Sequence, residues 1–249
     1  MSLYESLRIA LNRLGVDICR VGPERLGRIL SLDLDTLAGN PEVIFDVGAN
    51  TGRAARFFLK HFPRANVYSF EPFRASFDEL RSDPRLASIK AFNVALGSKS
   101  QEATLHSFKG SELNSLLTLD SNASTFLEPG ELEHLNAVTV RVTTLDDFCE
   151  RHSIARIDIL KIDTQGFDLE VLCGAQRLLA SKCVRVIQVE ANFVSLYRGQ
   201  PTFGQIVDYL SDAGYGLVGL YDVARNPAGD MKWADAVFCE NIVHSGIDA

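Results

Sequence analysis

Residues 43–52 read VIFDVGANTG, and this stretch decides which fold the chain can adopt. Apolar residues lead into Asp46, and two glycines, Gly48 and Gly52, follow at a spacing of four. The pattern predicts a buried strand that ends in a tight turn, with a helix that begins after Gly52. In doubly wound α/β proteins such a strand-to-helix corner holds an adenosine-containing cofactor. We therefore expect a cofactor at this turn.

Two other nucleotide-binding loops do not fit this corner. The dinucleotide motif G-x-G-x-x-G requires glycines where this chain has Asn50 and Arg53. A phosphate-binding loop requires Gly-Lys-Ser/Thr, and no such sequence follows Gly52. The turn is therefore not typical of nicotinamide dinucleotides or nucleoside triphosphates.

The composition is that of a globular protein without a nucleic-acid-binding surface. The chain has 249 residues and a net charge of −7, and its basic residues form no stripe of the kind that binds a nucleic-acid backbone. No run of about 18 apolar residues predicts a membrane span, and no signal-peptide core is present. The five cysteines are scattered, odd in number and without a C-x-x-C pair, which favours free thiols in a reducing cytoplasm.

Strand and helix patterns alternate after residue 42. We expect strands at 43–47, 66–70, 89–94, 157–162 and 185–189, and helices at 53–61, 74–81, 145–152, 169–179 and 203–213. Repeated strand–helix units predict a mostly parallel sheet covered by helices on both faces. The last two strands, at 216–221 and 235–239, have no helix between them, so they are expected to form an antiparallel pair at one edge.

The domain organisation follows from where this alternation begins. Residues 1–40 are expected to form an N-terminal helical extension and residues 41–249 a single α/β domain. Residues 3–14 carry apolar side chains at helical spacing, and this helix could cap the sheet, cover the cofactor or form a homodimer contact. Residues 109–136 are polar and weakly periodic, as in a long functional or mobile loop.

Two positions beyond the turn fit recognition of an adenosine. Glu71 directly follows the strand at 66–70, where an acid can accept hydrogen bonds from both ribose hydroxyls. Asn93 lies at the end of the third strand, close to where the adenine ring lies in such a sheet. Asn93 could contact the base or orient the loop, and it could equally serve only to end the strand.

Two acids end neighbouring core strands. Asp163 follows the strand at 157–162, and Glu190 follows the next strand along the chain, so both are expected at one crevice. The pair could hold Mg²⁺ or another divalent cation, bind substrate or transfer a proton. Lys161 is an isolated charge in an apolar strand and needs a partner if it is buried, so its role could be structural or functional.

The ordered set of motifs resembles the FkbM-type family of S-adenosylmethionine-dependent methyltransferases. The matching stretches are FDVGANTG (45–52), SFEP (69–72), VAL (94–96), VTTLDDF (142–148), KIDTQGFDLEVLCGA (161–175), VIQVE (186–190) and DAGYGL (212–217). The resemblance implies an α/β fold with a Rossmann-like seven-stranded class I methyltransferase sheet, mostly parallel with an antiparallel C-terminal hairpin strand. It also implies O-methylation of a hydroxyl on a sugar, glycan or polyketide-like small molecule.

The same resemblance assigns roles to individual residues. By position, the resemblance implies that Asp46, Gly48, Asn50 and Gly52 hold the methionine end of the cofactor. It implies that Glu71 binds the ribose and that Asn93 and Val94 lie near the adenine. The family often reads D-x-E-G where this chain has D-T-Q-G at 163–166. Gln165 keeps hydrogen bonding but removes a negative charge, which puts a proton-transfer or metal role at that position in doubt.

Catalysis then requires a group that takes up the proton of the acceptor hydroxyl. Asp163 or Glu190 could be that base, or could coordinate a metal ion that acidifies the hydroxyl. The acceptor pocket is expected from residues 109–136 and 192–202, and Tyr197, Arg198 and Trp233 are candidate contacts.

Two other functions remain open from the sequence. A nicotinamide-dependent oxidoreductase on a related sheet is disfavoured by the missing third glycine and by the closing hairpin. A non-catalytic cofactor-binding protein is compatible with Gln165. Binding of S-adenosylmethionine without binding of NAD would exclude the first, and methyl transfer to a metabolite pool would exclude the second.

Overall fold

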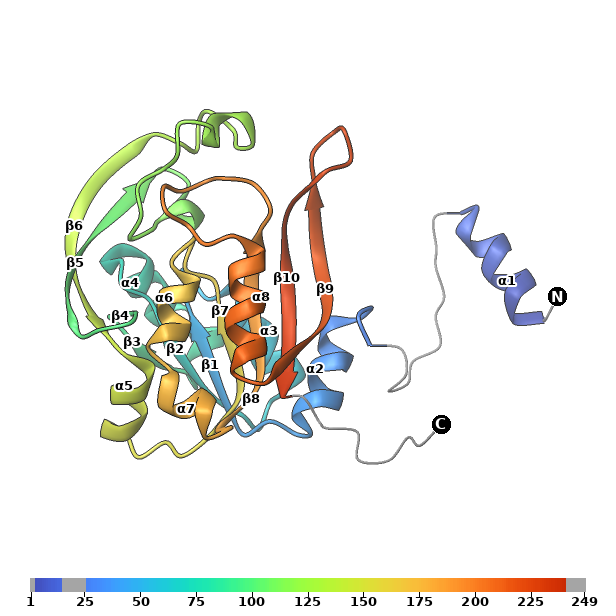
Figure 1. Cartoon of the computed structure of the whole chain (residues 1–249), viewed down its shortest axis with the longest axis horizontal. Helices are drawn as coiled ribbons and strands as arrows, with labels where there is room; N and C mark the ends of the chain where they lie inside the picture. The colour runs from blue at the N-terminus through green and yellow to red at the C-terminus, as the bar shows by residue number, and fades with distance from the viewer. Residues whose placement is uncertain (1–2, 15–25, 241–249) are drawn as a thin grey trace.

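The computed structural model describes residues 3–14 and 26–240, and its centre is a seven-stranded sheet with the strand order β3-β2-β1-β7-β8-β10-β9 (Figure 1). The strands of this sheet are β1 (Val43–Val47), β2 (Asn66–Phe70), β3 (Lys90–Phe92), β7 (Ile157–Ile162), β8 (Val184–Asn192), β9 (Tyr215–Arg225) and β10 (Met231–Glu240). The helices are α1 (Leu3–Asn12), α2 (Leu30–Ala38), α3 (Arg53–His61), α4 (Arg74–Ser82), α5 (Leu145–Arg151), α6 (Asp168–Cys173), α7 (Gln176–Ala180) and α8 (Phe203–Asp212). Cys19 and part of the expected N-terminal extension, residues 15–25, lie outside the described residues.

The pairing of the strands confirms the predicted sheet. The five strands β3, β2, β1, β7 and β8 run parallel to one another. β10 lies between β8 and β9 and is antiparallel to both. Val47, at the end of β1, lies opposite Phe70 of β2 and Ile162 of β7. The residues that follow these three strands therefore meet at one edge of the sheet.

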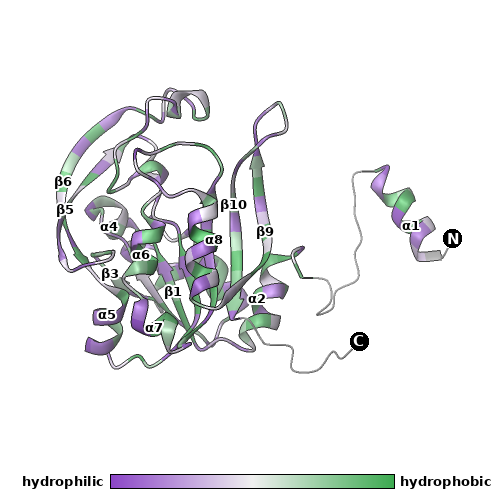
Figure 2. Cartoon of the chain, viewed as in Figure 1, coloured by the Kyte–Doolittle hydropathy of each residue, from purple (hydrophilic) through white to green (hydrophobic). Residues whose placement is uncertain are grey.

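The hydrophobic core lies on both faces of the sheet, because successive side chains of a strand point to opposite faces. Phe45 and Leu160 belong to the cluster covered by α5, α6, α7 and α8. Ile44 and Ile159, one position earlier, belong to the cluster covered by α2, α3 and α4. The surrounding helices carry both polar and apolar residues, as amphipathic helices do (Figure 2). Full burial of each such side chain contributes about 1.5–3 kcal/mol.

The segment before the first strand contributes to this core. Leu34 and Ala38 of α2 are buried in the cluster that contains Ile44. Asp33 of the same helix is buried, and its Oδ2 accepts a hydrogen bond of 2.7 Å from the hydroxyl of Tyr221 on β9. The division of the chain at residue 40 stays a prediction, and α2 packs directly on the sheet.

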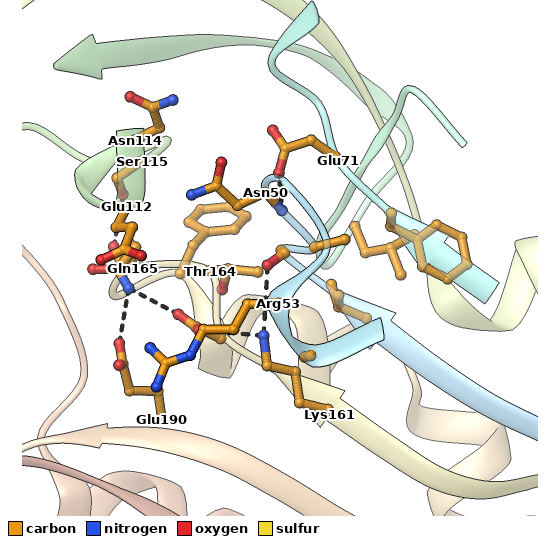
Figure 3. Close-up of a pocket in the computed structure, with 18 of the residues that line it drawn as sticks. Asn50, Arg53, Glu71, Glu112, Asn114, Ser115, Lys161, Thr164, Gln165 and Glu190 are labelled. Atoms are coloured by element: carbon orange, nitrogen blue, oxygen red, sulfur yellow. Dashed lines mark hydrogen bonds and ion pairs between the residues drawn. The ribbon is translucent and has the colours of Figure 1, made fainter. Parts of the chain in front are cut away.

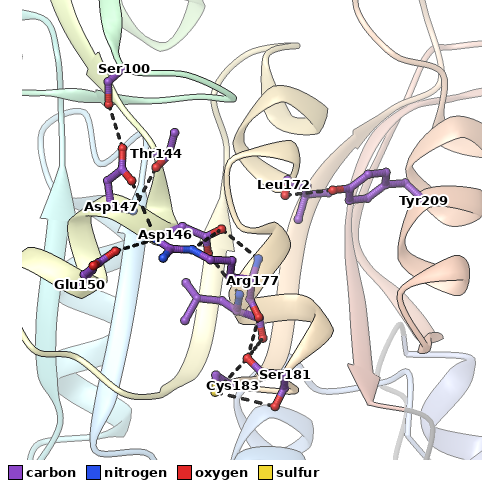
Figure 4. Close-up of polar contacts among 11 residues, drawn as sticks. Ser100, Thr144, Asp146, Asp147, Glu150, Leu172, Arg177, Ser181, Cys183 and Tyr209 are labelled. Atoms are coloured by element: carbon purple, nitrogen blue, oxygen red, sulfur yellow. Dashed lines mark hydrogen bonds and ion pairs between the residues drawn. The ribbon is translucent and has the colours of Figure 1, made fainter.

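One predicted helix is wrong in its extent. The helix expected at 169–179 is divided into α6 and α7 at Gly174, where a Cβ would lie 2.1 Å from the carbonyl oxygen of Gly97. The close approach of the Gly97 loop leaves no room for a side chain there. Asp146 then caps the new helix, since its carboxylate accepts a hydrogen bond of 2.8 Å from the backbone N–H of Arg177 (Figure 4).

The third strand is also shorter than expected. β3 ends at Phe92, and the chain leaves the main sheet to form β4 (Ala95–Leu96), which pairs with β6 in a separate sheet of order β4-β6-β5. In this sheet β5 (Gln101–Phe108) and β6 (His134–Thr143) are antiparallel. β6 begins at His134, inside the stretch expected to be a loop, because its first residues pair with the end of β5.

The long polar loop between β5 and β6 lies beside the loop between β8 and α8. It contains two short 3-10 helices, η3 (Ser111–Leu113) and η4 (Ala123–Thr125). The backbone N–H of Asp120 donates to the carbonyl of Leu196 (2.8 Å), and an isolated bridge joins Leu119 to Tyr197. Backbone hydrogen bonds thus connect the two segments expected to form the acceptor pocket.

The described residues include no helix that is both long and apolar enough to cross a lipid bilayer. The cysteines among them, Cys149, Cys173, Cys183 and Cys239, are free thiols.

Candidate active site

A cavity of about 340 Å³ opens where the central parallel strands end (Figure 3). Its wall includes the turn after β1, the loop after β2, the turn after β7, and parts of β8, β10 and the η3 segment. The carboxyl ends of parallel strands are where doubly wound sheets bind ligands. The volume lies within the range of small-molecule sites.

The turn after β1 is held by its neighbouring strands. Gly48 has φ +79°, and a Cβ at this position would lie 1.8 Å from the carbonyl oxygen of Asp163. The backbone N–H groups of Gly48 and Ala49 both donate to the carbonyl of Phe70 at 3.0 Å. Gly48 is therefore required by the close approach of the β7 turn, and it also lines the cavity.

Gly52, the second glycine of the turn, lies behind the cavity wall. It has φ +88°, and a Cβ there would lie 2.3 Å from Leu86 and 2.7 Å from Leu80. Gly52 is buried and is not part of the cavity wall. The structure places it under α4, where it lets α3 start in close contact with these leucines.

Glu71 projects from the loop after β2 into the cavity wall and is 6% exposed. Its carboxylate accepts hydrogen bonds from the backbone N–H groups of Asn50 (2.8 Å) and Phe73 (2.7 Å). Burial raises the pKa of Glu71 to about 7, although both N–H donors favour the charged form. Each carboxylate oxygen retains a lone pair, so the side chain can still accept hydrogen bonds from a ligand.

Asn93 and Val94 follow β3 and differ in position. The Asn93 amide donates hydrogen bonds of 2.9 Å to the carbonyls of Glu71 and Pro72, so it orients the loop that carries Glu71. Val94 lines the cavity and Asn93 does not. Of the two roles open for Asn93 from the sequence, the structure shows the orientation of the loop.

Lys161 connects two strand ends by ion pairs. Its Nζ lies 3.3 Å from Asp46 Oδ1 and 3.2 Å from Asp163 Oδ2. Burial alone would lower the pKa of Lys161, but the carboxylates of Asp163 and Asp46 outweigh it and raise that pKa. Asp46 has no exposed surface, and burial raises its pKa despite the charge of Lys161. The structure thus places Asp46 behind the cavity wall, in contact with Lys161.

Asp163 and Glu190 line the same cavity, and the side chain of Gln165 lies between them. The Gln165 Nε2 lies 2.8 Å from Asp163 Oδ1 and 2.8 Å from Glu190 Oε2 (Figure 3). Burial raises the pKa of Glu190 well above its usual value, and the nearby charge of Asp163 raises it further. All three side chains line the cavity.

The arrangement of these acids bears on metal binding. The described residues contain no group of three or more His, Cys, Asp or Glu side chains that could hold a metal ion. The space between Asp163 and Glu190 is occupied by the N–H donors of Gln165, which do not ligate a cation. A divalent cation at this pair would require Gln165 to turn away.

The model of one protein family covers most of the chain. The family described as Methyltransferase FkbM domain matches residues 46–217, from Asp46 at the end of β1 to the beginning of β9. The chain belongs to the FkbM methyltransferase family. It is therefore a methyltransferase that uses S-adenosylmethionine. The two alternatives that the sequence left open, a nicotinamide-dependent oxidoreductase and a non-catalytic cofactor-binding protein, are set aside.

Two relatives of this methyltransferase carry descriptive names. The chain is 28% identical over 182 residues to the 2-O-methyltransferase NoeI of Sinorhizobium fredii, covering 68% of this chain and 70% of NoeI. It is 25% identical over 154 residues to the hexuronic acid methyltransferase AglP of Haloferax volcanii, covering 62% of this chain and 58% of AglP. The crystal structure of precorrin-6y C5,15-methyltransferase from Geobacter metallireducens matches with a TM-score of 0.46 and 13% identity, over 85% of this chain and 86% of that one.

The cavity of the methyltransferase fits its methyl donor. Asn50 stands in the wall with a buried Oδ1 that has no hydrogen-bond partner among the described residues, so it can accept from a ligand. Its φ of +45° bends the backbone toward the cavity beside Gly48. Glu71 offers carboxylate lone pairs in the same wall. Asn50 and Glu71 thus both offer hydrogen-bond acceptors to a ligand in the cavity, as the polar groups of S-adenosylmethionine require.

Several wall residues of the methyltransferase were not predicted individually. They come from distant parts of the chain and include Arg53, Glu112, Asn114, Ser115, Asp222 and Asp235. Residues 109–136 were expected to form part of the pocket, but no periodicity indicates which of their side chains point inward. Of the candidate acceptor contacts, Trp233 lines the cavity, Tyr197 is buried next to Gln165, and Arg198 is exposed.

Proposed function

We propose that the protein transfers a methyl group from S-adenosylmethionine to a hydroxyl of a sugar or glycan. The observation that carries this proposal is the pair Asp163 and Glu190, which face the cavity of a methyltransferase from neighbouring strands. A pair of carboxylates supplies a proton acceptor for a hydroxyl nucleophile. The names of NoeI and AglP, a 2-O-methyltransferase and a hexuronic acid methyltransferase, support this acceptor class.

The cofactor is proposed to lie along the turn after β1. Gly48 and Asn50 would contact its methionine end, Glu71 its ribose hydroxyls, and Val94 the region of the adenine. Asp46, Gly52 and Asn93 would support these contacts from behind the wall. S-adenosylmethionine supplies an electrophilic methyl group on a sulfonium, so the protein needs to place the acceptor oxygen in line with it.

Glu190 is the better proton acceptor of the two acids. Asp163 Oδ2 is ion-paired to Lys161 at 3.2 Å and Oδ1 faces the Gln165 amide at 2.8 Å, so both of its oxygens are already engaged. Glu190 has no ion pair with a described residue, and burial together with neighbouring carboxylates raises its pKa. In its ionised form, a carboxylate with a raised pKa takes a proton from a hydroxyl more readily. Glu190 would take up the proton of the acceptor hydroxyl as the methyl group passes from the sulfonium sulfur to the acceptor oxygen, which leaves the demethylated cofactor as a neutral thioether.

The wall of the cavity also carries groups that suit a sugar. Trp233 presents an aromatic surface on which the apolar face of a sugar ring can pack. Glu112, Asp222 and Asp235 add carboxylates that can accept hydrogen bonds from ring hydroxyls. This combination supports a polyhydroxylated acceptor over a purely apolar polyketide.

The direct test is methyl transfer from radiolabelled S-adenosylmethionine to a panel of sugars, with mass spectrometry to find products about 14 Da heavier. Matched deoxysugars that lack one hydroxyl locate the methylated oxygen. We expect product with at least one hydroxyl acceptor and none with its deoxy analogue. Labelled product whose methyl group is on nitrogen or carbon would contradict the proposal.

Three further expectations join this proposal. Free thiols among the described cysteines support a cytoplasmic location, which fractionation of the source cells tests. Leu7 and Ile9 of α1 are exposed, which supports a homodimer contact that sedimentation can test. A requirement for Mg²⁺ or another divalent cation is tested by the rate in the presence of a chelator.

A further inference from the structure

Gln165 lies between the two acids of the site and uses both hydrogens of its amide. Its Nε2 lies 2.8 Å from Asp163 Oδ1 and 2.8 Å from Glu190 Oε2. An amide nitrogen has two N–H bonds, so one can point at each carboxylate. Asp163 Oδ2 is paired with Lys161. Glu190 Oε1, in contrast, accepts no hydrogen bond from a described residue, and it is the oxygen left for an acceptor hydroxyl.

Tyr197 determines which way the Gln165 amide faces. The phenol oxygen lies 3.0 Å from Gln165 Oε1 and 3.1 Å from the carbonyl of Leu113. The single phenolic hydrogen faces both of these acceptors, and Oε1 on the side of the tyrosine leaves Nε2 on the side of the carboxylates. Tyr197 is 1% exposed and comes from the β8–α8 loop, so a buried side chain far along the chain holds this orientation.

The backbone at Gln165 is held in an uncommon conformation. Its φ is +54°, in the left-handed region that costs about 1–2 kcal/mol for a residue with a Cβ. Ser115 Oγ donates to the Gln165 carbonyl at 2.7 Å, and Asp168 accepts from the backbone N–H of Thr164 (2.8 Å) and Gly166 (3.2 Å). Contacts on both sides therefore maintain the turn that points Gln165 into the cavity.

We propose that Gln165 is a positioning residue for methyl transfer, which fixes the Glu190 carboxylate with Oε1 toward the acceptor. The idea rests on the proposed function and adds a residue to it. A glutamate at position 165, the residue that the family often has there, would place a third acid between Asp163 and Glu190; ionised it would supply no donor, and protonated it would supply a donor to only one of them. Like charges at this distance repel, so the carboxylates would separate and Glu190 would lose its orientation.

Kinetics of three variants test the proposal, with the acceptor that the wild-type enzyme methylates. Gln165→Glu is expected to lower kcat about 100-fold, the cost of a misplacement of about 1 Å at a reacting centre. Tyr197→Phe is expected to lower kcat by a smaller factor, because it releases the amide without adding a charge. Gln101→Glu adds the same charge at an exposed position on β5 and is expected to keep kcat within twofold.

Two further measurements separate positioning from general damage. Calorimetry is expected to show S-adenosylmethionine affinity within threefold of wild type in Gln165→Glu, with the loss confined to kcat. The effects of Gln165→Glu and Tyr197→Phe are expected to be non-additive, since both act on one amide. A kcat for Gln165→Glu within twofold of wild type would overturn the proposal, as would fully additive effects.

A measurement without any acceptor keeps this proposal distinct from the proposed function. In cofactor-free protein labelled with ¹⁵N-glutamine, the two side-chain amide protons of Gln165 are expected to exchange slowly with solvent. Glu190→Gln is expected to shift one of the two resonances much more than the other. Fast exchange of both protons would show that Gln165 does not bridge the acids, whatever the acceptor of the enzyme is.

Discussion

Gly48 and Asp163 lie in backbone contact, so that a Cβ on Gly48 would stand 1.8 Å from the Asp163 carbonyl oxygen. This contact joins the turn after β1, which carries the proposed cofactor contacts, to the strand end that carries the acids. The backbone N–H of Asp163 also donates to the carbonyl of Val47 at 3.0 Å. The turn proposed to bind the methyl donor and the strand end that carries Asp163 therefore pack against each other as one unit.

Gly48→Ala is expected to destabilise the protein and abolish methyl transfer. The left-handed φ costs about 1–2 kcal/mol for alanine, and overpacking adds about 1–3 kcal/mol. Gly199→Ala is a matched control, because Gly199 has φ +78° and nothing lies within 4 Å of its added Cβ. Urea unfolding would measure both variants, and equal losses of stability would show that the Asp163 contact is not limiting.

Lys161→Met is expected to destabilise the protein by about 3–5 kcal/mol. The substitution leaves Asp46 and Asp163 without their shared positive partner, and removal of one member of a buried pair leaves a buried charge uncompensated. The double variant Lys161→Met, Asp46→Asn is expected to recover part of the loss, because one of the two stranded charges is removed. Chemical denaturation measures each free energy of unfolding, and no recovery in the double variant would argue against the pairing with Asp46.

Binding of S-adenosylmethionine is expected to weaken as the pH falls below about 7. Burial raises the pKa of Glu71 to about 7, and only the ionised carboxylate can accept hydrogen bonds from both ribose hydroxyls. The ligand thus favours the deprotonated form, so affinity is full above this pKa and falls up to tenfold per pH unit below it.

Calorimetry from pH 5.5 to 8.5 measures this dependence. Glu71→Gln is expected to bind more weakly at every pH and to show a flatter profile, since its side chain does not titrate. An unchanged slope in Glu71→Gln would assign the titration to another group.

Glu190→Gln is expected to lower kcat by about 10²–10⁴-fold, which is the contribution of a positioned general base. The affinity for S-adenosylmethionine is expected to be unchanged, because Glu190 lies beyond Gln165 from the turn after β1 (Figure 3). Glu112→Gln removes a cavity-lining acid of the η3 segment and is expected to alter mainly the KM for the acceptor. If Glu190→Gln retained the wild-type kcat, Asp163 would become the candidate base.

Local patterns predicted where the site lies. Asp46, Glu71, Asp163 and Glu190 each follow or end a strand of recognisable apolar sequence, and parallel strands bring their carboxyl ends to one edge. Their mutual proximity could therefore be deduced without coordinates. The split of α6 from α7 could not, because it depends on the approach of Gly97 to Gly174, two positions that are distant in the chain.

The sequence by itself determined the order of the elements, the parallel sheet with its closing hairpin, and the edge of the sheet at which the cavity lies. Those features depend on residues close together in the chain, where periodicity and turn residues act. Only the tertiary structure decided that Gly48 is required by Asp163, that Asp46 reaches the site through Lys161, and that Tyr197 orients Gln165 between two acids. These contacts join residues 32 to 115 positions apart in the chain. Local periodicity does not distinguish the side chains that make them from their neighbours, so packing decides which ones meet.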